Sequence, residues 1–299
     1  MPQQAIKDLH WLLTSPSLLR REALPAGIGH GDAALGQDWW QRLQGCVLEP
    51  PAAAAGPGFR LGRYAEGLMQ TALAALPGHQ LLAHQLPVRE GGVSLGEFDY
   101  LLARPGGLPA LHIELAVKFY IALPTVQGLH YVGPGLHDAL ALKLARLNEH
   151  QLRLAQTPAG QAALPEGVIV EPMAWLRGRM FYREPDTPAG RELAADHLRG
   201  WWRCWGEALP RQRPDSRWRS LAKPDWLAST ADDGRALSYR DWQQETARHF
   251  VHSHWPLLVA EYAPPEEGGA ELARGMLLAP NWPDPAMLAR LCTQLPLAD

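Results

Sequence analysis

The sequence predicts a mixed α/β protein built around one hydrophobic core. Two segments, residues 60–76 and 137–156, repeat apolar residues at helical spacing, and three strand-like runs lie between them. Hydrophobic residues make up 46% of the 299 residues, enough for a buried core, and the chain is longer than a usual single domain. We therefore expect an α/β core over residues 59–184 with additions at both ends.

The N-terminal addition, residues 1–58, is predicted to be helical and to end in a linker. Asp8 is a candidate N-cap for a helix over the Leu/Trp run that follows it, and a second amphipathic piece covers residues 38–43. Residues 49–58 hold three prolines and two glycines, which break the helical pattern. This last segment is the predicted linker to the core.

The core is predicted to begin with a helix over residues 60–76, which contains Glu66 and ends at a Pro-Gly pair. Two strand-like runs follow, at residues 80–88 and 95–103. The residues between them include Arg-Glu-Gly-Gly, which is typical of a hairpin turn. We therefore expect an antiparallel pair of strands directly after the helix.

The third strand, residues 110–123, is long, apolar and β-branched at several positions, as in a strand buried on both faces. A helix is predicted over residues 137–156, with Gln151 on its apolar face. Residues 168–175 and 179–183, separated by an Arg-Gly pair, are then predicted to form a strand pair. The core thus has the order helix, strand, strand, strand, helix, strand.

Charge and cysteine content exclude several classes of protein. The 28 basic and 31 acidic residues give a net charge of −3, which excludes a basic, nucleic-acid-binding coat over the whole surface. The three cysteines lie far apart with no CxxC pair, which excludes a zinc ribbon and a disulfide scaffold. Neither a signal peptide nor an apolar run of membrane-spanning length is present, so we expect a cytoplasmic protein without a membrane partner.

Charged residues occur inside two strands that otherwise have core character. Only four of the basic residues are lysines, and one of these, Lys118, lies in the predicted buried strand. Period-two geometry places it on one face with His112 and Glu114, and places Glu97 with Asp99 on one face of the preceding strand. Buried charges are costly unless they are paired or bound to metal. These residues therefore indicate either an ion-pair network or a site for a hard cation such as Mg²⁺.

The same residues resemble the PD-(D/E)XK nuclease superfamily, which has the restriction-endonuclease-like fold. The resemblance lies in Glu66 on a helix, Asp99 in the GEFDYLL strand, and Glu114 with Lys118 in HIELAVKFYI. Over most of the chain, GEFD, ELAVKFY, a helix ending in ARLNEHQL, and a late E-x-x-R followed by Asn-Trp-Pro are similar to a bacterial family of unknown function, DUF1853, within that superfamily. The resemblance implies a restriction-endonuclease-like mixed sheet flanked by helices.

The resemblance also implies a role for each candidate residue. Asp99 and Glu114 would hold a divalent metal, Mg²⁺ or Mn²⁺, and Glu66 would complete or modulate that site. Lys118 would position or activate the attacking water. Gln151 would orient a ligand or a phosphate, although a core glutamine bonded to backbone fits its position equally well.

The spacing of the acid and the lysine departs from the superfamily pattern. The superfamily places these residues two apart, whereas Glu114 and Lys118 are four apart, about 13 Å of strand instead of about 7 Å. The residue two before the lysine is Ala116. Either Glu114 is the ligand and the lysine is displaced, which we favour, or Lys118 keeps its place and Glu97 or Glu66 supplies the acid. A third alternative is a site that has lost catalysis.

Residues 185–299 form the predicted C-terminal accessory region, which is rich in tryptophan and arginine. Eight of the twelve tryptophans lie at or after Trp201. Residues 191–223 hold seven arginines and one lysine against four acids. Arginine can contact phosphate and tryptophan can stack on bases, but tryptophan at this density is more typical of a core.

Together these patterns predict a Mg²⁺- or Mn²⁺-dependent nuclease that hydrolyses phosphodiester bonds in nucleic acid, with DNA as the expected substrate. The alternative is a catalytically inactive nucleic-acid- or protein-binding module on the same fold. In that case the acids and the lysine would form an internal ion-pair network.

Overall fold

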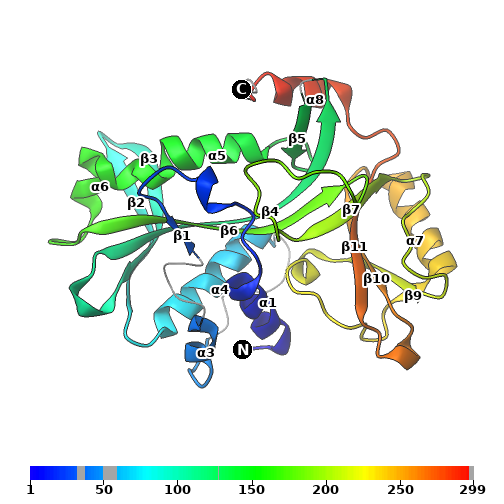
Figure 1. Ribbon diagram of the computed structural model, residues 1–299, viewed down its shortest axis with the longest axis horizontal. Helices are drawn as coiled ribbons and strands as arrows, with labels where there is room; N and C mark the ends of the chain where they lie inside the picture. Colours follow the sequence, from blue (N-terminus) through cyan, green and yellow to red (C-terminus); the bar gives the residue numbers. More distant parts are fainter. Residues whose placement is uncertain (32–37, 50–58, 127, 296–299) are drawn as a thin grey trace. The chain divides into compact units, whose positions relative to one another are not determined.

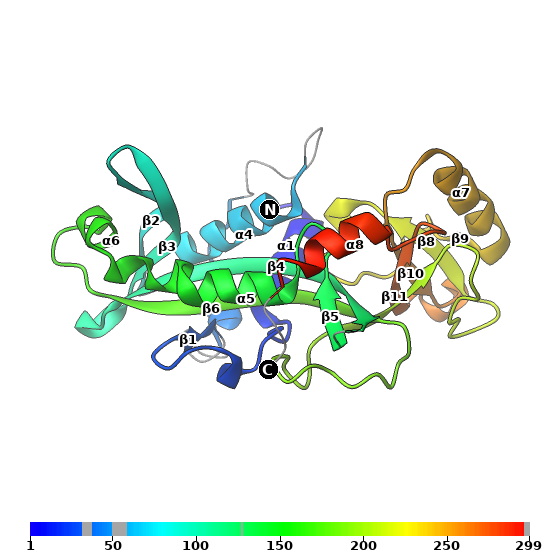
Figure 2. The same ribbon diagram turned by 90° about the horizontal axis from the view of Figure 1, so that it is seen from above.

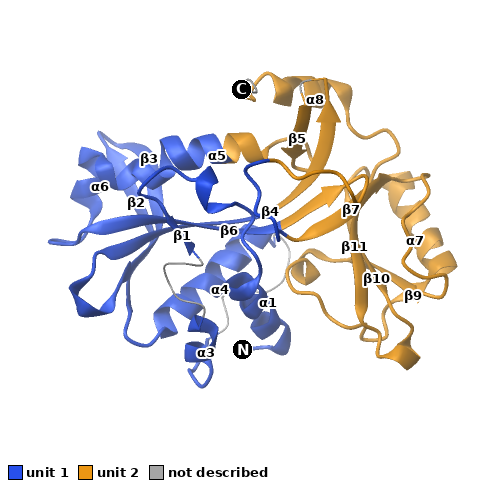
Figure 3. Cartoon of the chain, in the orientation of Figure 1, with its two compact units in different colours: residues 1–118, 144–178, 191–197 blue, residues 119–143, 179–190, 198–299 orange. Residues whose placement is uncertain are grey.

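The computed structural model describes residues 1–31, 38–49, 59–126 and 128–295, and the predicted linker lies almost wholly outside them (Figure 1). The described chain divides into two compact units (Figure 3). Unit 1 comprises residues 1–118, 144–178 and 191–197, and unit 2 comprises residues 119–143, 179–190 and 198–299. None of the described helices combines the length and the apolar character needed to cross a membrane.

The prediction of a mixed α/β protein is confirmed. One sheet of eleven strands has the order β2-β3-β4-β6-β7-β11-β10-β8-β9, with β1 beside β6 and β5 beside β4. The strands are β1 (Gly29–His30), β2 (Gln80–Glu90), β3 (Val93–Ala103), β4 (Ala110–Thr125), β5 (Gly128–Val132), β6 (Val170–Tyr182), β7 (Arg199–Cys204), β8 (Arg217–Leu221), β9 (Leu237–Ser238), β10 (Leu257–Tyr262) and β11 (Glu271–Leu278). The seven α-helices within the described ranges are α1 (Gln3–Thr14), α3 (Trp39–Leu43), α4 (Leu61–Ala75), α5 (Leu140–Glu149), α6 (Pro158–Ala163), α7 (Tyr239–His252) and α8 (Pro285–Cys292).

Unit 1 contains the elements that the sequence predicts for the start of the core. Helix α4 leads into the antiparallel hairpin β2–β3, whose two-residue turn is formed by Gly91 and Gly92, both with positive φ. Strand β3 then pairs antiparallel with β4. Helix α4 lies on one face of these strands, and the part of α5 from Leu144 onward lies on the other (Figures 1 and 2).

Two helix predictions are corrected. Asp8 does not cap a helix, because α1 begins five residues earlier and encloses it. Its buried carboxylate accepts hydrogen bonds from the Tyr64 hydroxyl (2.8 Å) and from the Gln4 amide (3.0 Å). The helix predicted over residues 137–156 is α5 followed by a 3₁₀ helix, Gln151–Gln156, so Gln151 begins a new element.

The strand pair predicted over residues 168–183 is also wrong, because β6 runs through this region without a turn. The Arg-Gly pair that suggested a turn lies in the middle of the strand. Gly178 has φ of 147°, and a Cβ atom there would overlap the backbone carbonyl of Lys118 on β4. The glycine thus permits a close approach of two backbones and does not mark a turn.

This close approach gives a first stability prediction. We expect Gly178→Ala to lower the free energy of unfolding by about 3 kcal/mol, since it adds a backbone clash to an unfavourable φ. Gly167→Ala is the matched control, because Gly167 has φ of 73° but open space around its Cβ position; we expect it to cost about 1 kcal/mol. Urea denaturation measures both, and equal losses would contradict the proposed backbone contact.

Unit 2 is held together by tryptophan packing. Trp201, Trp218 and Trp242 form one cluster with Phe250 and the aliphatic residues around them. Strands β7 and β11 pair in parallel, and β10 pairs antiparallel with both β11 and β8. These tryptophans therefore belong to a core, as their density suggests, and do not form a platform for base stacking.

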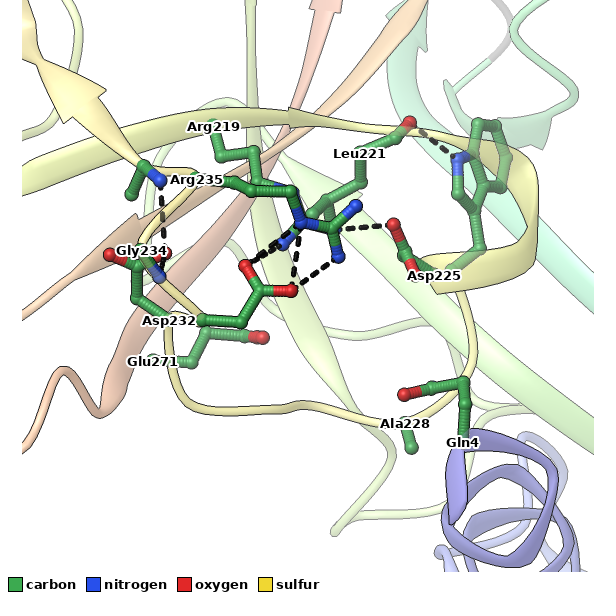
Figure 4. Close-up of polar contacts among 12 residues, drawn as sticks. Gln4, Arg219, Leu221, Asp225, Ala228, Asp232, Gly234, Arg235 and Glu271 are labelled. Atoms are coloured by element: carbon green, nitrogen blue, oxygen red, sulfur yellow. Dashed lines mark hydrogen bonds and ion pairs between the residues drawn. The ribbon is translucent and has the colours of Figure 1, made fainter. Parts of the chain in front are cut away.

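An ion-pair network covers one end of unit 2. Arg219 pairs with Asp225 and with Asp233, and Arg235 pairs with the same Asp233 (2.6 Å; Figure 4). Asp232 accepts the backbone N–H of Gly234 (3.1 Å) and so closes the adjoining turn. The network contains two arginines and two acids, so its charges balance without a ligand.

Candidate functional site

Asp99 lies where the pairing between β3 and β4 ends. The pairs continue as far as Tyr100 with Ile113. Beyond that point the Asp99 carboxylate accepts the backbone N–H of Leu115 through Oδ2, at 2.9 Å. A side chain thus takes the place of the backbone partner, so the two strands separate beside Asp99.

The backbone of β2 opposite Asp99 has an unusual conformation. The register is the same on both sides of Asp99, with His84 paired to Tyr100 and Leu86 to Phe98, and Gln85 lies between these pairs. Gln85 has φ of 51°, in the left-handed region that residues other than glycine seldom adopt. Strict alternation also fails on β3, since Phe98 and Leu101 pack in one cluster although the pattern places them on opposite faces. Left-handed residues other than glycine cluster at functional sites.

A polar pocket of about 380 Å³ opens beside Asp99 between the β2–β3 hairpin on one side and the last turn of α5 with the residues that follow it on the other. Its charged and hydrogen-bonding side chains are Arg89, Ser94, Glu97, Asp99, Arg146, His150 and Gln151. The pocket therefore combines two carboxylates with two guanidinium groups. Such a set suits a ligand that carries negative charge together with a bound cation.

Glu114 lies behind this pocket and belongs to a buried hydrogen-bond network. Its side chain is only 1% exposed. One carboxylate oxygen accepts from His112 Nε2 at 2.8 Å, and the other accepts from the Gln151 amide at 2.6 Å. Because Gln151 also lines the pocket, the network connects a buried carboxylate to the pocket wall and fixes the orientation of the amide.

Glu66 lies on α4, half-buried, and its carboxylate accepts a hydrogen bond from the Gln85 amide at 3.1 Å. Burial raises the pKa of the Glu66 carboxyl, and the negative charge of Glu97 adds to the rise. The hydrogen bond from Gln85 and the charge of Arg63 act in the opposite direction but do not cancel it. Glu66 thus holds a proton to higher pH than an exposed glutamate.

The raised pKa predicts a pH-dependent contribution to stability. Since the folded chain binds this proton more tightly than the unfolded chain, stability from this group is present at low pH. It is lost as the pH rises from the unfolded value, about 4.3, through the folded one. We therefore expect the unfolding free energy of the wild type to fall over this window relative to Glu66→Gln. Denaturation at a series of pH values tests this, with Glu90→Gln on β2 as control; parallel curves for wild type and Glu66→Gln would contradict it.

The structure brings some of the predicted residues together and separates others. Asp99 and Gln151 line the pocket, and Glu114 contacts it through Gln151. Glu66 and Lys118 are not among the described residues that line it, and Lys118 lies half-buried on β4. The roles implied for these residues by resemblance thus stay predictions.

Two arginines of the pocket and one histidine of the network behind it received no role from the sequence. His112 was placed on the face of Glu114 by alternation, but its hydrogen bond to that carboxylate was not anticipated. Arg89 and Arg146 are isolated arginines on a hairpin and a helix, and no spacing distinguishes them from exposed residues.

A divalent metal in this pocket would need some of its ligands from a substrate. Within the described ranges, no three His, Cys, Asp or Glu residues lie close enough together to hold a metal ion. Mg²⁺, however, commonly uses one or two carboxylates and completes its shell with water and substrate phosphate oxygens. Asp99 and Glu97, which line the same pocket, fit that arrangement. Glu114 already accepts two hydrogen bonds and would have to rearrange to take part.

Comparison with known proteins identifies the family. The sequence model of a family described as Domain of unknown function (DUF1853) matches residues 7–278. The chain belongs to the DUF1853 family. No curated protein and no solved structure matches it. The DUF1853 match includes every residue of the pocket beside Asp99, so this pocket is part of the family domain and not of an appended segment.

Proposed function

We propose that the protein is a metal-dependent nuclease with a restriction-endonuclease-like core and that the pocket beside Asp99 is its active site. The observation that carries the proposal is the position of Asp99. It interrupts the pairing of β3 with β4 and lines a pocket that also holds Glu97, Arg89 and Arg146. A phosphodiester needs both cationic groups for its phosphate and carboxylates for a metal, and this pocket provides both.

The order of elements supports the same proposal. Helix α4, strands β2, β3 and β4, helix α5 and strand β6 follow one another as in the predicted core, with β5 as an added strand beside β4. Strand β4 lies between β3 and β6 in the sheet. Asp99 on β3 and Glu114 on β4 thus lie on neighbouring strands, and Glu66 lies on the helix before them, in the arrangement that the resemblance implies.

The proposed roles follow from the contacts. Arg89 and Arg146 would bind and orient the phosphate, and Gln151, held by Glu114, would present its amide to the substrate. Asp99 and Glu97 would hold Mg²⁺, which supplies Lewis-acid stabilisation of the charge that develops on the phosphate. Lys118 does not line the pocket, so its role in positioning water stays a prediction.

A cleavage assay tests the proposed function. Purified protein is incubated with plasmid DNA, single-stranded DNA and RNA in Mg²⁺ or Mn²⁺, with a chelator as the negative control. We expect metal-dependent cleavage of at least one substrate, with DNA the expected one. If none of the three substrates is cleaved with Mg²⁺ or with Mn²⁺, the proposal is contradicted.

One observation favours the alternative of a non-catalytic binding module on the same fold. Both carboxylate oxygens of Glu114 already accept hydrogen bonds, and the residue is buried, as an internal structural network requires. In that case nucleic acid or protein would bind without metal, and Asp99→Asn would leave binding unchanged. Binding measured with and without a chelator separates the two functions.

A further inference from the structure

A second pocket, within unit 2, is lined by an unusual number of arginines. It has a volume of about 420 Å³. Five arginines line it, contributed by β6, β7, β11 and the residue after β6: Arg179, Arg183, Arg199, Arg203 and Arg274. Among the described residues, Glu271 is the one acid that lines the pocket with them. We call this the arginine pocket.

The arginine pocket differs from the ion-pair network of Figure 4 in its charge balance. Three of its arginines have acidic partners: Arg183 with Glu207, Arg203 with Glu184, and Arg274 with Glu271. The other two, Arg179 and Arg199, have no ion-pair partner among the described residues. Within the described ranges, these two positive charges are therefore left without a carboxylate in ion-pair contact.

The contacts of these two arginines hold them at the pocket wall. Arg179 donates to the backbone carbonyl of Arg199 at 2.6 Å. Arg199 donates to the carbonyls of Pro185 (3.0 Å) and Thr187 (2.8 Å), and its guanidinium lies 3.6 Å from the ring centre of Tyr182. Carbonyl groups and an aromatic face orient guanidinium groups but do not neutralise them.

The electrostatics of Arg179 also indicate a missing partner. Burial, followed by repulsion from Arg274, lowers the pKa of Arg179 to about 10, and the opposing attraction of Glu271 does not cancel this. The charge of Arg179 is therefore held at a cost that an anion would relieve.

We propose that the arginine pocket binds a terminal phosphate group carried by a ligand of nucleotide size. A phosphomonoester carries about two negative charges near neutral pH, which matches the two arginines without an ion pair. A phosphodiester carries only one charge, and a continuous strand needs an open groove. A volume of about 420 Å³ lies within the range of pockets for small organic ligands.

Either a free nucleotide or the 5′-phosphorylated end of a strand could present this group. The proposal does not depend on nuclease activity, because its residues all belong to unit 2 whereas the pocket beside Asp99 belongs to unit 1. Binding and cleavage can therefore fail separately.

Isothermal titration calorimetry on the full chain at physiological salt tests the proposal. Pyrophosphate and AMP are the probes, with adenosine as the control that lacks the phosphate. A pair of short oligonucleotides, one with a 5′-phosphate and one with a 5′-hydroxyl, distinguishes the two sources. We expect AMP or pyrophosphate to bind saturably and adenosine not to bind. Preference for the 5′-phosphorylated oligonucleotide over free AMP would assign the site to strand ends.

A matched pair of variants locates the binding. Arg179→Gln removes one uncompensated charge, and we expect it to weaken binding at least about tenfold. Arg240→Gln removes the same charge from an exposed position of α7 and should bind as the wild type does. If thermal unfolding shows that Arg179→Gln does not fold, Arg199→Gln, which removes the other arginine without an ion pair, takes its place with the same expected loss. No saturable binding of either phosphate probe, or equal weakening by the pocket and control variants, would overturn the proposal.

Discussion

Asp99→Asn is expected to reduce nucleic-acid cleavage about a thousandfold or more, which corresponds to about 4 kcal/mol of transition-state stabilisation. Asparagine can still accept the backbone N–H of Leu115 through its side-chain oxygen, so the local structure should persist. It lacks the negative charge that a divalent cation requires. The loss should therefore appear in the cleavage rate with little change in thermal stability.

The control for this experiment is Glu90→Gln, which removes an exposed carboxylate from the same hairpin. We expect its cleavage rate to match that of the wild type. If Asp99→Asn cleaved as fast as Glu90→Gln, the pocket beside Asp99 would not be the active site, even though the protein would be a nuclease.

The second large effect concerns the buried network behind the pocket. Glu114→Ala is expected to lower the free energy of unfolding by about 4 kcal/mol, because it leaves buried donors of His112 and Gln151 without an acceptor and opens a cavity. Urea denaturation of the purified variant measures the loss. The effect should be present with or without metal, since the network consists of side chains alone.

A double-mutant cycle shows whether the network acts as a unit. Gln151→Ala removes one donor and is expected to cost about 2 kcal/mol. The double variant should cost less than the two single changes together, because the two residues contact each other. A loss below about 1 kcal/mol for Glu114→Ala, with additive effects, would contradict the network.

Much of unit 1 could be predicted from the sequence because its signals are local. The apolar spacing of α4 and the Gly91-Gly92 turn of the hairpin depend only on neighbouring residues. Alternation likewise placed His112 with Glu114, and the hydrogen bond between them confirms the shared face. Asp99 could be singled out because a charge within a buried strand is costly wherever that strand lies.

The remaining features depend on contacts between distant segments. An Arg-Gly pair such as that at Gly178 is typical of a turn, and only the contact of Gly178 with the backbone of Lys118 shows why a glycine lies inside a strand. The left-handed φ of Gln85 and the shared cluster of Phe98 and Leu101 are not dictated by neighbouring residues either. Period-two geometry placed Glu97 with Asp99, which do line one pocket, but it could not show that Arg89 and Arg146 line it with them.

The arginine pocket could not be predicted from the sequence, because it too depends on contacts between distant segments. Its arginines come from segments about twenty and seventy residues apart in the chain, which the parallel pairing of β6 with β7 and of β7 with β11 brings together. The basic composition of residues 191–223 gave only a general indication of phosphate binding.

The central claim is that Asp99 holds a divalent metal in its pocket, and binding of Mn²⁺ followed by electron paramagnetic resonance tests it most directly. Free Mn²⁺ gives a sharp signal that weakens on binding, so the bound fraction is read without any cleavage. With a short oligonucleotide present to supply phosphate oxygens, we expect wild type and Glu90→Gln to bind about one equivalent and Asp99→Asn to bind none. Equal binding by wild type and Asp99→Asn, or no binding by the wild type, would contradict the claim.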